Sequence, residues 1–305
     1  LGIDNSYDMV LSENQKNKVY FSNLLALNYP PIWKEICNVL SIYGYSAGRL
    51  TYTKDYWCRD FMPIQVGSNE FVQFQYDPDY LTDLRKYKTN PNDTVKHITD
   101  FTPKISKSKL LVDGGTIVVC NNINEETWVV MTEKVLIENP DFSKAEITSM
   151  LEKDLGARIV WLPWDTSDEC GHTDGIVNFI NGLSSKPSIM AYFSLYPKNI
   201  AKEMRKLLND VFDTHELIFT HDEKNNWAYV NLLRTKDFII VPGLGTDSDN
   251  EAMGQIERLY PDYKGRIHQI IIAPIVEEYG GAFNCLTWTV NTEDIDSYIS
   301  IPGFV

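Results

Sequence analysis

Several features that mark particular classes of protein are scarce or missing in these 305 residues. No apolar run reaches the roughly 18 residues that a membrane-spanning helix needs. Basic residues are outnumbered, 28 against 42 acidic ones, which gives a net charge of −14. An acidic chain repels phosphate backbones and anionic lipid surfaces, so we expect neither a nucleic-acid nor a membrane partner. The same charge is compatible with a cationic small-molecule ligand, or with solubility alone.

Closely spaced cysteines are also missing, since the five are scattered at positions 37, 58, 120, 170 and 285. Nothing resembles a disulfide framework or a paired zinc motif. Cys170 and His172 could offer two zinc ligands, but the other histidines lie in no motif, so we expect no metal. Reduced thiols indicate a cytoplasmic protein. The chain opens on Leu1 and not on Met, which leaves an earlier, removed leader as an alternative.

Helical and strand patterns alternate along the chain, without a linker rich in Pro, Gly or Ser. Amphipathic helical patterns begin near residues 30, 80, 143, 199 and 247, and the pattern near 80 is the weakest. Ser143 and Glu146 form a capping box. Strand patterns rich in Val, Ile, Tyr and Phe lie at 70–76, 109–112, 116–120, 128–131, 158–162, 188–193, 238–241 and 266–273. Helix starts that recur roughly every 50 to 60 residues predict a repeated unit, or an α/β protein whose units happen to be similar in size.

Four short segments combine glycine or a tight turn with reactive side chains. They are 57–63, 113–115, 171–175 and 280–287. Their candidate residues lie roughly 30 to 40 positions after a predicted helix start, as does an asparagine of the fourth unit. Equivalent positions in the units of a closed ring would face a common centre. The residues that we expect to converge there are Asp60, Asp113, His172, Asn231 and Cys285.

This set of side chains suits one kind of chemistry. A cysteine thiolate is a strong nucleophile, and a neighbouring histidine can activate it or transfer protons. Carboxylates beside this pair can accept the paired hydrogen bonds that a planar guanidinium donates. Holding the guanidinium in this way presents its central carbon to the sulfur. The pattern therefore indicates cleavage of a carbon–nitrogen bond in a guanidine.

The sequence resembles the family of agmatine deiminases and Porphyromonas-type peptidyl-arginine deiminases, part of the pentein superfamily. The matching segments occur in the family's order at 57–63, 113–115, 161–163, 171–174, 229–231 and 280–287. The resemblance implies an α/β fold, the pentein five-bladed α/β propeller with pseudo-fivefold repeats. It also implies that residues 1–305 form a single catalytic domain, and that no metal or organic cofactor takes part.

The resemblance further implies a role for each motif residue. Cys285 would attack the guanidinium carbon, and His172 would protonate the departing amine and then activate water. Asp60 and Asp174 would hold the guanidinium nitrogens. A covalent thiouronium would be hydrolysed to a ureido product after ammonia had left. Three further residues would contact the substrate or support the site: Trp57, Asp113 and Asn231.

Three departures from the family pattern bear on the substrate: Met62 where glycine is usual, Ala282 at the third glycine, and Asn284 where histidine is common. We expect Met62 to narrow the mouth or alter the turn. The substrate could be agmatine, free arginine or an arginine-containing peptide, as decided by loops within 82–109 and 165–170. An amidinotransferase and a catalytically silent binding module stay as alternatives, and a homodimer is one expectation for the assembly.

Each motif residue also has a structural interpretation. Cys285 alone could be a buried structural thiol. Asp60 could form a simple ion pair with its neighbour Arg59, and Trp57 could belong to the core. We prefer the catalytic interpretation because the motifs occur together.

Overall fold

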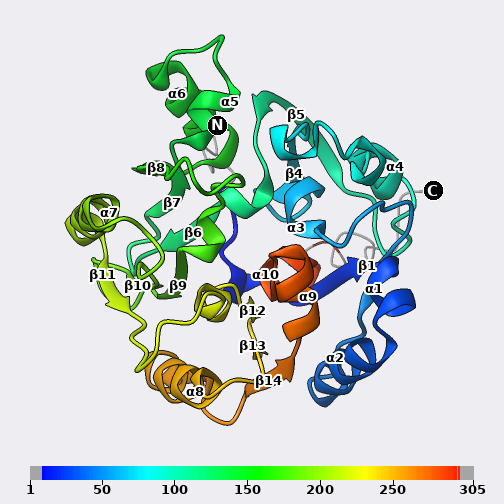
Figure 1. The fold of residues 1–305 in the computed structure, drawn as a ribbon. Helices are drawn as coiled ribbons and strands as arrows, with labels where there is room; N and C mark the ends of the chain where they lie inside the picture. Colours follow the sequence, from blue (N-terminus) through cyan, green and yellow to red (C-terminus); the bar gives the residue numbers. More distant parts are fainter. Residues whose placement is uncertain (1–8, 294, 296–305) are drawn as a thin grey trace.

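The computed structural model describes residues 9–293 and 295, and within them the strands form five three-stranded sheets. Figure 1 shows the sheets as a ring around the short helices α3 (Cys58–Phe61) and α10 (Phe283–Leu286). The strand orders are β15 (Thr287–Val290)–β1 (Lys18–Ser22)–β2 (Gly48–Leu50), β3 (Ile64–Gln65)–β4 (Glu70–Gln75)–β5 (Lys104–Leu111), β6 (Val118–Asn121)–β7 (Thr127–Thr132)–β8 (Arg158–Leu162), β9 (Val177–Asn181)–β10 (Ser188–Ala191)–β11 (Asp213–Glu216), and β12 (Leu233–Arg234)–β13 (Ile239–Gly243)–β14 (Ile267–Ile271).

All five sheets share one topology. In each, the first strand pairs antiparallel with the central strand, and the third strand pairs parallel with it. Parallel neighbours need a crossover connection, and a helical segment supplies it in every unit. The prediction of five similar units is therefore confirmed.

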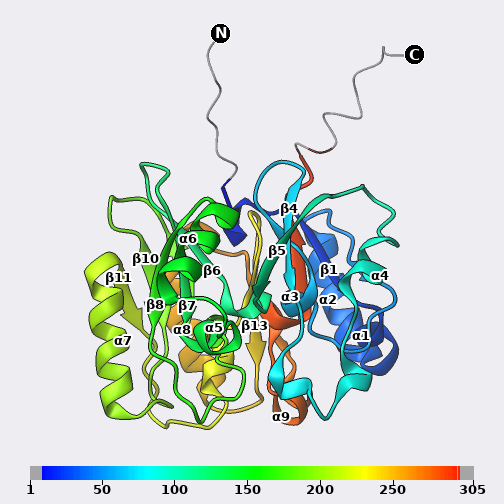
Figure 2. The ribbon, with the colours of Figure 1, turned by 90° about the horizontal axis from the view of Figure 1, so that it is seen from above.

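The crossover helices cover the outside of the ring. Four of them are amphipathic and begin where the sequence predicts: α2 (Pro30–Ile42), α6 (Lys144–Leu155), α7 (Lys198–Val211) and α8 (Ser248–Leu259). In α7, for example, Ala201, Met204 and Leu208 are buried at the spacing of one helix face. Figure 2, seen at right angles to Figure 1, shows α7 and α2 on opposite flanks with the strands between them.

The helix predicted near Tyr80 is wrong in its extent. The second crossover contains only the 3-10 turns η2 (Asp79–Leu81) and η3 (Arg85–Tyr87), followed by the short helix α4 (Pro91–Val95). The Tyr80 hydroxyl donates a hydrogen bond to Asp113 in the centre of the ring. Tyr80 therefore does not belong to a helix on the outside of the ring. The helix begins later because Asn90 caps it and proline occupies its first position.

The two ends of the described chain close the ring. Strand β15 pairs with β1 from Lys18 opposite Val290 to Phe21 opposite Thr287. No helix of the described residues is both long and apolar enough to cross a membrane. All five cysteines are free thiols. The other helical segments are η1 (Glu13–Gln15), α1 (Asn23–Asn28), α5 (Lys134–Glu138), η4 (Gly114–Thr116), η5 (Thr173–Gly175), η6 (Asn226–Tyr229), η7 (Pro261–Tyr263) and α9 (Ala273–Tyr279).

Candidate active site

Five short helical turns bring the predicted residues together at the centre of the ring. Each turn comes just before the first strand of a sheet, so the fivefold repeat places the turns in equivalent positions. Helix α3 lies against both α10 and η4, and η4 lies against η5. The predicted residues on or next to these turns are Asp60 (α3), Asp113 (before η4), His172 and Asp174 (η5), Asn231 (after η6) and Cys285 (α10).

The thiol of Cys285 is held by two polar side chains. The residue is 7 % exposed. The side-chain amide of Asn231 donates to Sγ at 3.1 Å, and its oxygen accepts from the Cys285 backbone N–H at 3.2 Å. Sγ itself lies 3.4 Å from Oδ2 of Asp174 and can donate to it as a thiol. These contacts give the thiol a fixed direction within the site.

His172 lies between two carboxylates. Its Nε2 is 3.2 Å from Oδ2 of Asp113, and its Nδ1 is 3.6 Å from Oδ1 of Asp60. The hydroxyl of Tyr80 donates to the same Asp113 oxygen at 2.8 Å. Asp113 thus contacts the imidazole and not the cavity, which makes it an orienting group for His172.

Gly115 has no room for a side chain. The backbone N–H of Gly115 donates to Oδ1 of Asp60 at 3.1 Å. A β-carbon at this position would come within 2.6 Å of Nδ1 of His172 and 2.7 Å of that same Asp60 oxygen. Only glycine lets the backbone approach both side chains so closely.

Electrostatics hold the thiol and the imidazole in their protonated forms. Burial and then the charge of Asp174 raise the pKa of Cys285 to about 12, against the effect of His172. Burial lowers the pKa of His172, but the charge of Asp60 and hydrogen bonds with Asp113 and Cys285 outweigh it and raise the pKa well above its usual range. Burial also raises the pKa of Asp60. A cation entering the site would favour the thiolate.

A cavity of about 750 Å³ leads from solvent to these groups. Its buried end contains Cys285, His172 and Asp174. Its walls and outer rim include Leu195, Tyr196 and Trp227, the carboxylates Asp165, Asp168 and Glu277, and the exposed cation Lys224. Three carboxylates against one lysine make the entrance favourable for cations.

Comparison with known proteins identifies the family. Residues 49–290, most of the chain, match the sequence model of the Porphyromonas-type peptidyl-arginine deiminases. The chain belongs to this family. Members of this deiminase family are hydrolases that act on carbon–nitrogen bonds of amidines, so the predicted family and enzyme class are confirmed.

Individual relatives of this deiminase-family chain are distant. A proposed agmatine deiminase from Selenomonas ruminantium is 24 % identical over 293 aligned positions, which cover 77 % of this chain and 74 % of the relative. The solved structure of a C. jejuni agmatine deiminase superposes with a TM-score of 0.71 at 17 % identity, covering 92 % of this chain and 95 % of that one. An amidinotransferase from Microseira wollei superposes with a TM-score of 0.54 at 14 % identity, covering 89 % and 82 %. These likenesses confirm the predicted five-bladed α/β propeller.

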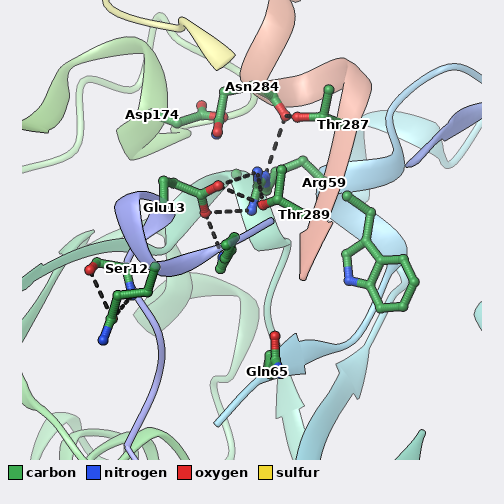
Figure 3. A network of polar contacts seen from close by, with 12 residues as sticks. Ser12, Glu13, Arg59, Gln65, Asp174, Asn284, Thr287 and Thr289 are labelled. Atoms are coloured by element: carbon green, nitrogen blue, oxygen red, sulfur yellow. Dashed lines mark hydrogen bonds and ion pairs between the residues drawn. The ribbon is translucent and has the colours of Figure 1, made fainter. Parts of the chain in front are cut away.

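One prediction and one structural alternative for side chains of this deiminase-family protein are wrong. Met62 is 2 % exposed and packs in an apolar cluster with Phe61, so it does not narrow the mouth of the cavity. Arg59 does not pair with Asp60, because its guanidinium reaches Glu13 at 3.1 Å. Figure 3 shows this pair beside Thr289 and the backbone of Asn284. Glu13, which lies outside the site, therefore neutralises the Arg59 cation, and Arg59 does not occupy the carboxylate of Asp60.

Trp57 and the two predicted loops have different positions. Trp57 is half-buried, and a β-carbon on Gly281 would come within 2.2 Å of its ring, so the indole packs on the backbone that leads to Cys285. It does not line the cavity around Cys285, and its contact with substrate stays a prediction. The loop 165–170 does line this cavity, whereas residues of 82–109 line a separate cavity of about 510 Å³.

Three residues that contribute to the site are not assigned to it by the sequence motifs. Tyr80 contacts Asp113, Glu13 balances Arg59, and Asn284 donates to Asp174. Glu13 and Tyr80 lie far from the motifs in sequence and carry no local signal. Asn284 departs from the family pattern next to the nucleophile, and that departure was the one available signal.

Proposed function

We propose that this chain, acting as a single catalytic domain, is a guanidine deiminase that hydrolyses agmatine to a ureido product and ammonia. One observation carries the proposal. The thiol of Cys285, the imidazole of His172 and the carboxylate of Asp174 meet at the buried end of an acidic cavity, with Oδ1 of Asp60 3.6 Å from Nδ1 of His172. This arrangement combines a nucleophile, a proton donor and anionic groups for a cationic substrate.

Binding comes first. A guanidinium placed at the buried end would donate to Asp174 and Asp60, whose charges it would balance in a site with little water. Its positive charge beside Sγ stabilises the thiolate, and this lowers the high pKa of Cys285. The thiol proton leaves to solvent. The substrate cation thus generates the nucleophile that attacks it.

The positions of Cys285 and His172 support the proposed covalent step. The Cys285 thiolate adds to the guanidinium carbon, and one carbon–nitrogen bond of the resulting tetrahedral adduct must break. His172, held in its imidazolium form, donates a proton to the departing nitrogen. Ammonia leaves, and the carbon remains bonded to sulfur as a thiouronium.

Hydrolysis restores the enzyme. The imidazole of His172 is now neutral and accepts a proton from a water molecule that attacks the thiouronium carbon. Collapse of this second adduct expels the thiolate and leaves a ureido group. Asp113 and Tyr80 hold the imidazole in place through both steps. No step requires a metal or an organic cofactor.

The charge of the rim favours agmatine among the possible guanidines. Agmatine carries a second cation at its far end, where Asp165, Asp168 and Glu277 line the cavity. Free arginine would bring a carboxylate towards these groups, and Lys224 is the one lysine or arginine described at this rim. An arginine-containing peptide would need room for a backbone at the same rim. We therefore expect agmatine to be turned over best.

The test is a comparison of substrates with the purified chain. Ammonia and ureido products are measured for agmatine, free arginine and an arginine-containing peptide, with Cys285→Ala as the blank. We expect kcat/KM to be highest for agmatine. Transfer of the amidino group to glycine or lysine would identify an amidinotransferase. Absence of both reactions with every substrate would favour a silent binding module and overturn the proposal.

A further inference from the structure

Asn284, the residue before the proposed nucleophile, is bonded to a carboxylate of the site. Its side-chain amide donates to Oδ2 of Asp174 at 2.7 Å. Asn284 and Asp174 are 7 % and 2 % exposed, so solvent does not compete for this bond. The same Asp174 oxygen is the one that lies 3.4 Å from Sγ of Cys285. One side chain thus fixes the oxygen that faces the sulfur.

The backbone of Asn284 is anchored on both sides. Its N–H donates to the carbonyl of Asn231 at 3.1 Å. Its own carbonyl accepts from Nε of Arg59 at 3.3 Å and from the hydroxyl of Thr287 at 3.1 Å. Figure 3 shows the carbonyl of Asn284 above the Arg59 guanidinium, with Asp174 beside the asparagine. An amide on so firmly held a backbone has little freedom to leave Asp174.

The Arg59 anchor is itself held by a buried network. Its guanidinium donates to Glu13 at 3.1 and 3.3 Å and to the hydroxyl of Thr289 at 3.2 Å. Burial raises the pKa of Glu13, but the charges of Arg59 and Lys16 outweigh it and lower the pKa to about 2. Glu13 therefore stays ionised and Arg59 stays paired. The position of Asn284 does not depend on a group that titrates near neutral pH.

We infer that Asn284 is a positioning residue that orients Asp174 towards the guanidinium without neutralising it. This inference rests on the proposed function. A cationic donor at this position would hold the carboxylate equally well, but its charge would offset the attraction for a cationic substrate. An amide donates a hydrogen bond and carries no charge. Asn284 thus gives Asp174 a fixed direction without placing an opposing charge beside it.

The test uses two substitutions and one matched control. Asn284→Ala removes the donor at every pH, and we expect kcat/KM for agmatine to fall roughly 10- to 100-fold, the range for a hydrogen bond to a charged group. Asn284→Asp places a carboxylic acid against Asp174, which can donate only while it holds a proton. Asn122→Ala removes another buried amide, one that bonds Glu126 and the carbonyl of Ser185 away from the site.

The pH profile separates positioning from general stability. We expect Asn284→Asp to be more active at low pH and to lose activity as the shared proton leaves, whereas Asn284→Ala keeps the wild-type profile at a lower level. Asn122→Ala should lower only the melting temperature. A kcat/KM of Asn284→Ala within threefold of wild type, or an Asn284→Asp profile like that of wild type, would overturn the inference.

A binding measurement distinguishes this inference from the proposed function. Agmatine is titrated by calorimetry into Cys285→Ala and into Cys285→Ala combined with Asn284→Ala. We expect the second Kd to be at least tenfold weaker. Equal Kd values with an active wild-type enzyme would overturn the inference alone. A wild-type chain that neither binds nor converts any guanidine would overturn the proposed function, and the inference with it.

Discussion

Asn231 holds Cys285 by both ends of one side-chain amide, which donates to Sγ at 3.1 Å and accepts from the Cys285 backbone N–H at 3.2 Å. The donor end matters for reactivity, because a hydrogen bond to sulfur favours the thiolate over the thiol. The acceptor end fixes the turn that carries the sulfur. Asn231 is wholly buried, so the amide has no alternative partner in solvent.

Replacing this amide should make the thiol less reactive. Asn231→Ala removes the donor to Sγ, so we expect the pKa of Cys285 to rise further and alkylation by iodoacetamide to slow about tenfold at pH 8, the effect of about one pKa unit. Asn231→Asp should slow it more, because a second carboxylate beside the sulfur opposes the thiolate. The measurement is the rate of alkylation against pH. Asn139→Ala, which removes another buried amide that bonds two backbone carbonyls, should leave that profile unchanged.

The assignment of the nucleophile can be tested by comparing two cysteines that line the same cavity. Cys285→Ala should reduce ammonia release by roughly a thousandfold or more, because the proposed covalent intermediate forms on the sulfur of Cys285. The fold should remain intact, since the change removes a single sulfur atom from a well-packed turn. Circular dichroism and the melting temperature check this point.

Cys170 supplies the matched control, since it is exposed at the mouth of the cavity. Among the described residues, the side chains that hold the sulfur of Cys285, Asn231 and Asp174, make no hydrogen bond to the thiol of Cys170. Cys170→Ala should therefore keep most of the activity. Loss of activity in this variant, together with retention in Cys285→Ala, would show that the nucleophile is misassigned.

A single methyl group at Gly115 should disrupt the site without touching the nucleophile. The β-carbon of Gly115→Ala would come within 2.7 Å of both His172 and Asp60, so one of these side chains must move. We expect kcat for agmatine to fall at least about 100-fold, because general acid catalysis of this size depends on the position of the imidazole.

A glycine in an outer helix is the control for Gly115→Ala. Gly254 lies in α8, where a β-carbon would meet only the far end of Arg258 at 3.7 Å. Gly254→Ala should stabilise the chain by about 0.5–1 kcal/mol, since alanine is the better helix former. Steady-state kinetics and thermal unfolding of both variants provide the comparison. Normal kinetics in Gly115→Ala would contradict the geometry of the site.

The sequence predicted those parts of the fold that depend on local patterns. Helices α2, α6, α7 and α8 begin within one residue of the expected positions, because caps and amphipathic spacing are encoded within each segment. Strand β8 occupies its predicted range. Short strands such as β3 and β12 were not predicted, because two residues carry no periodicity and their pairing depends on the ring.

The site was predicted in its residues but not in its internal contacts. Cys285 and His172 lie together because equivalent positions of the units face the centre, which spacing could indicate, whereas Asp174 was assigned from the family resemblance. Which carboxylate faces which imidazole nitrogen depends on side-chain packing, so the contact between Asp113 and His172 could not be predicted from spacing. Glu13 and Arg59 are 46 positions apart and meet only in the closed ring.

Asp55 tests how burial affects the pKa of a carboxyl group next to Trp57. It is 8 % exposed, its Oδ1 accepts from the backbone N–H of Trp57 at 2.9 Å, and its Oδ2 has no partner among the described residues. Burial, with a smaller contribution from the charge of Asp113, raises its pKa to about 7. In the unfolded chain an aspartate has a pKa of about 3.9. At a pH between these two pKa values, Asp55 therefore holds a proton in the folded state and has lost it in the unfolded state.

The sign of the pH dependence follows from this difference. Because the folded state binds more protons between about pH 4 and 7, the free energy of unfolding falls as the pH rises through that window. Asp55→Asn keeps an oxygen for the Trp57 N–H and does not titrate. Relative to wild type, the variant should gain stability from pH 5 to pH 8, on the order of 3 kcal/mol for a shift of this size.

Urea unfolding of both proteins at pH 5 and pH 8 measures this gain. The other buried acids titrate in wild type and variant alike, so the difference between the two proteins isolates Asp55. Asp60 is the partial exception, because the charge of Asp55 helps to raise its pKa and that contribution disappears with the substitution. The loss of this repulsion acts in the same direction and enlarges the gain at high pH. Parallel stability curves for the two proteins would show that Asp55 is not held protonated by burial.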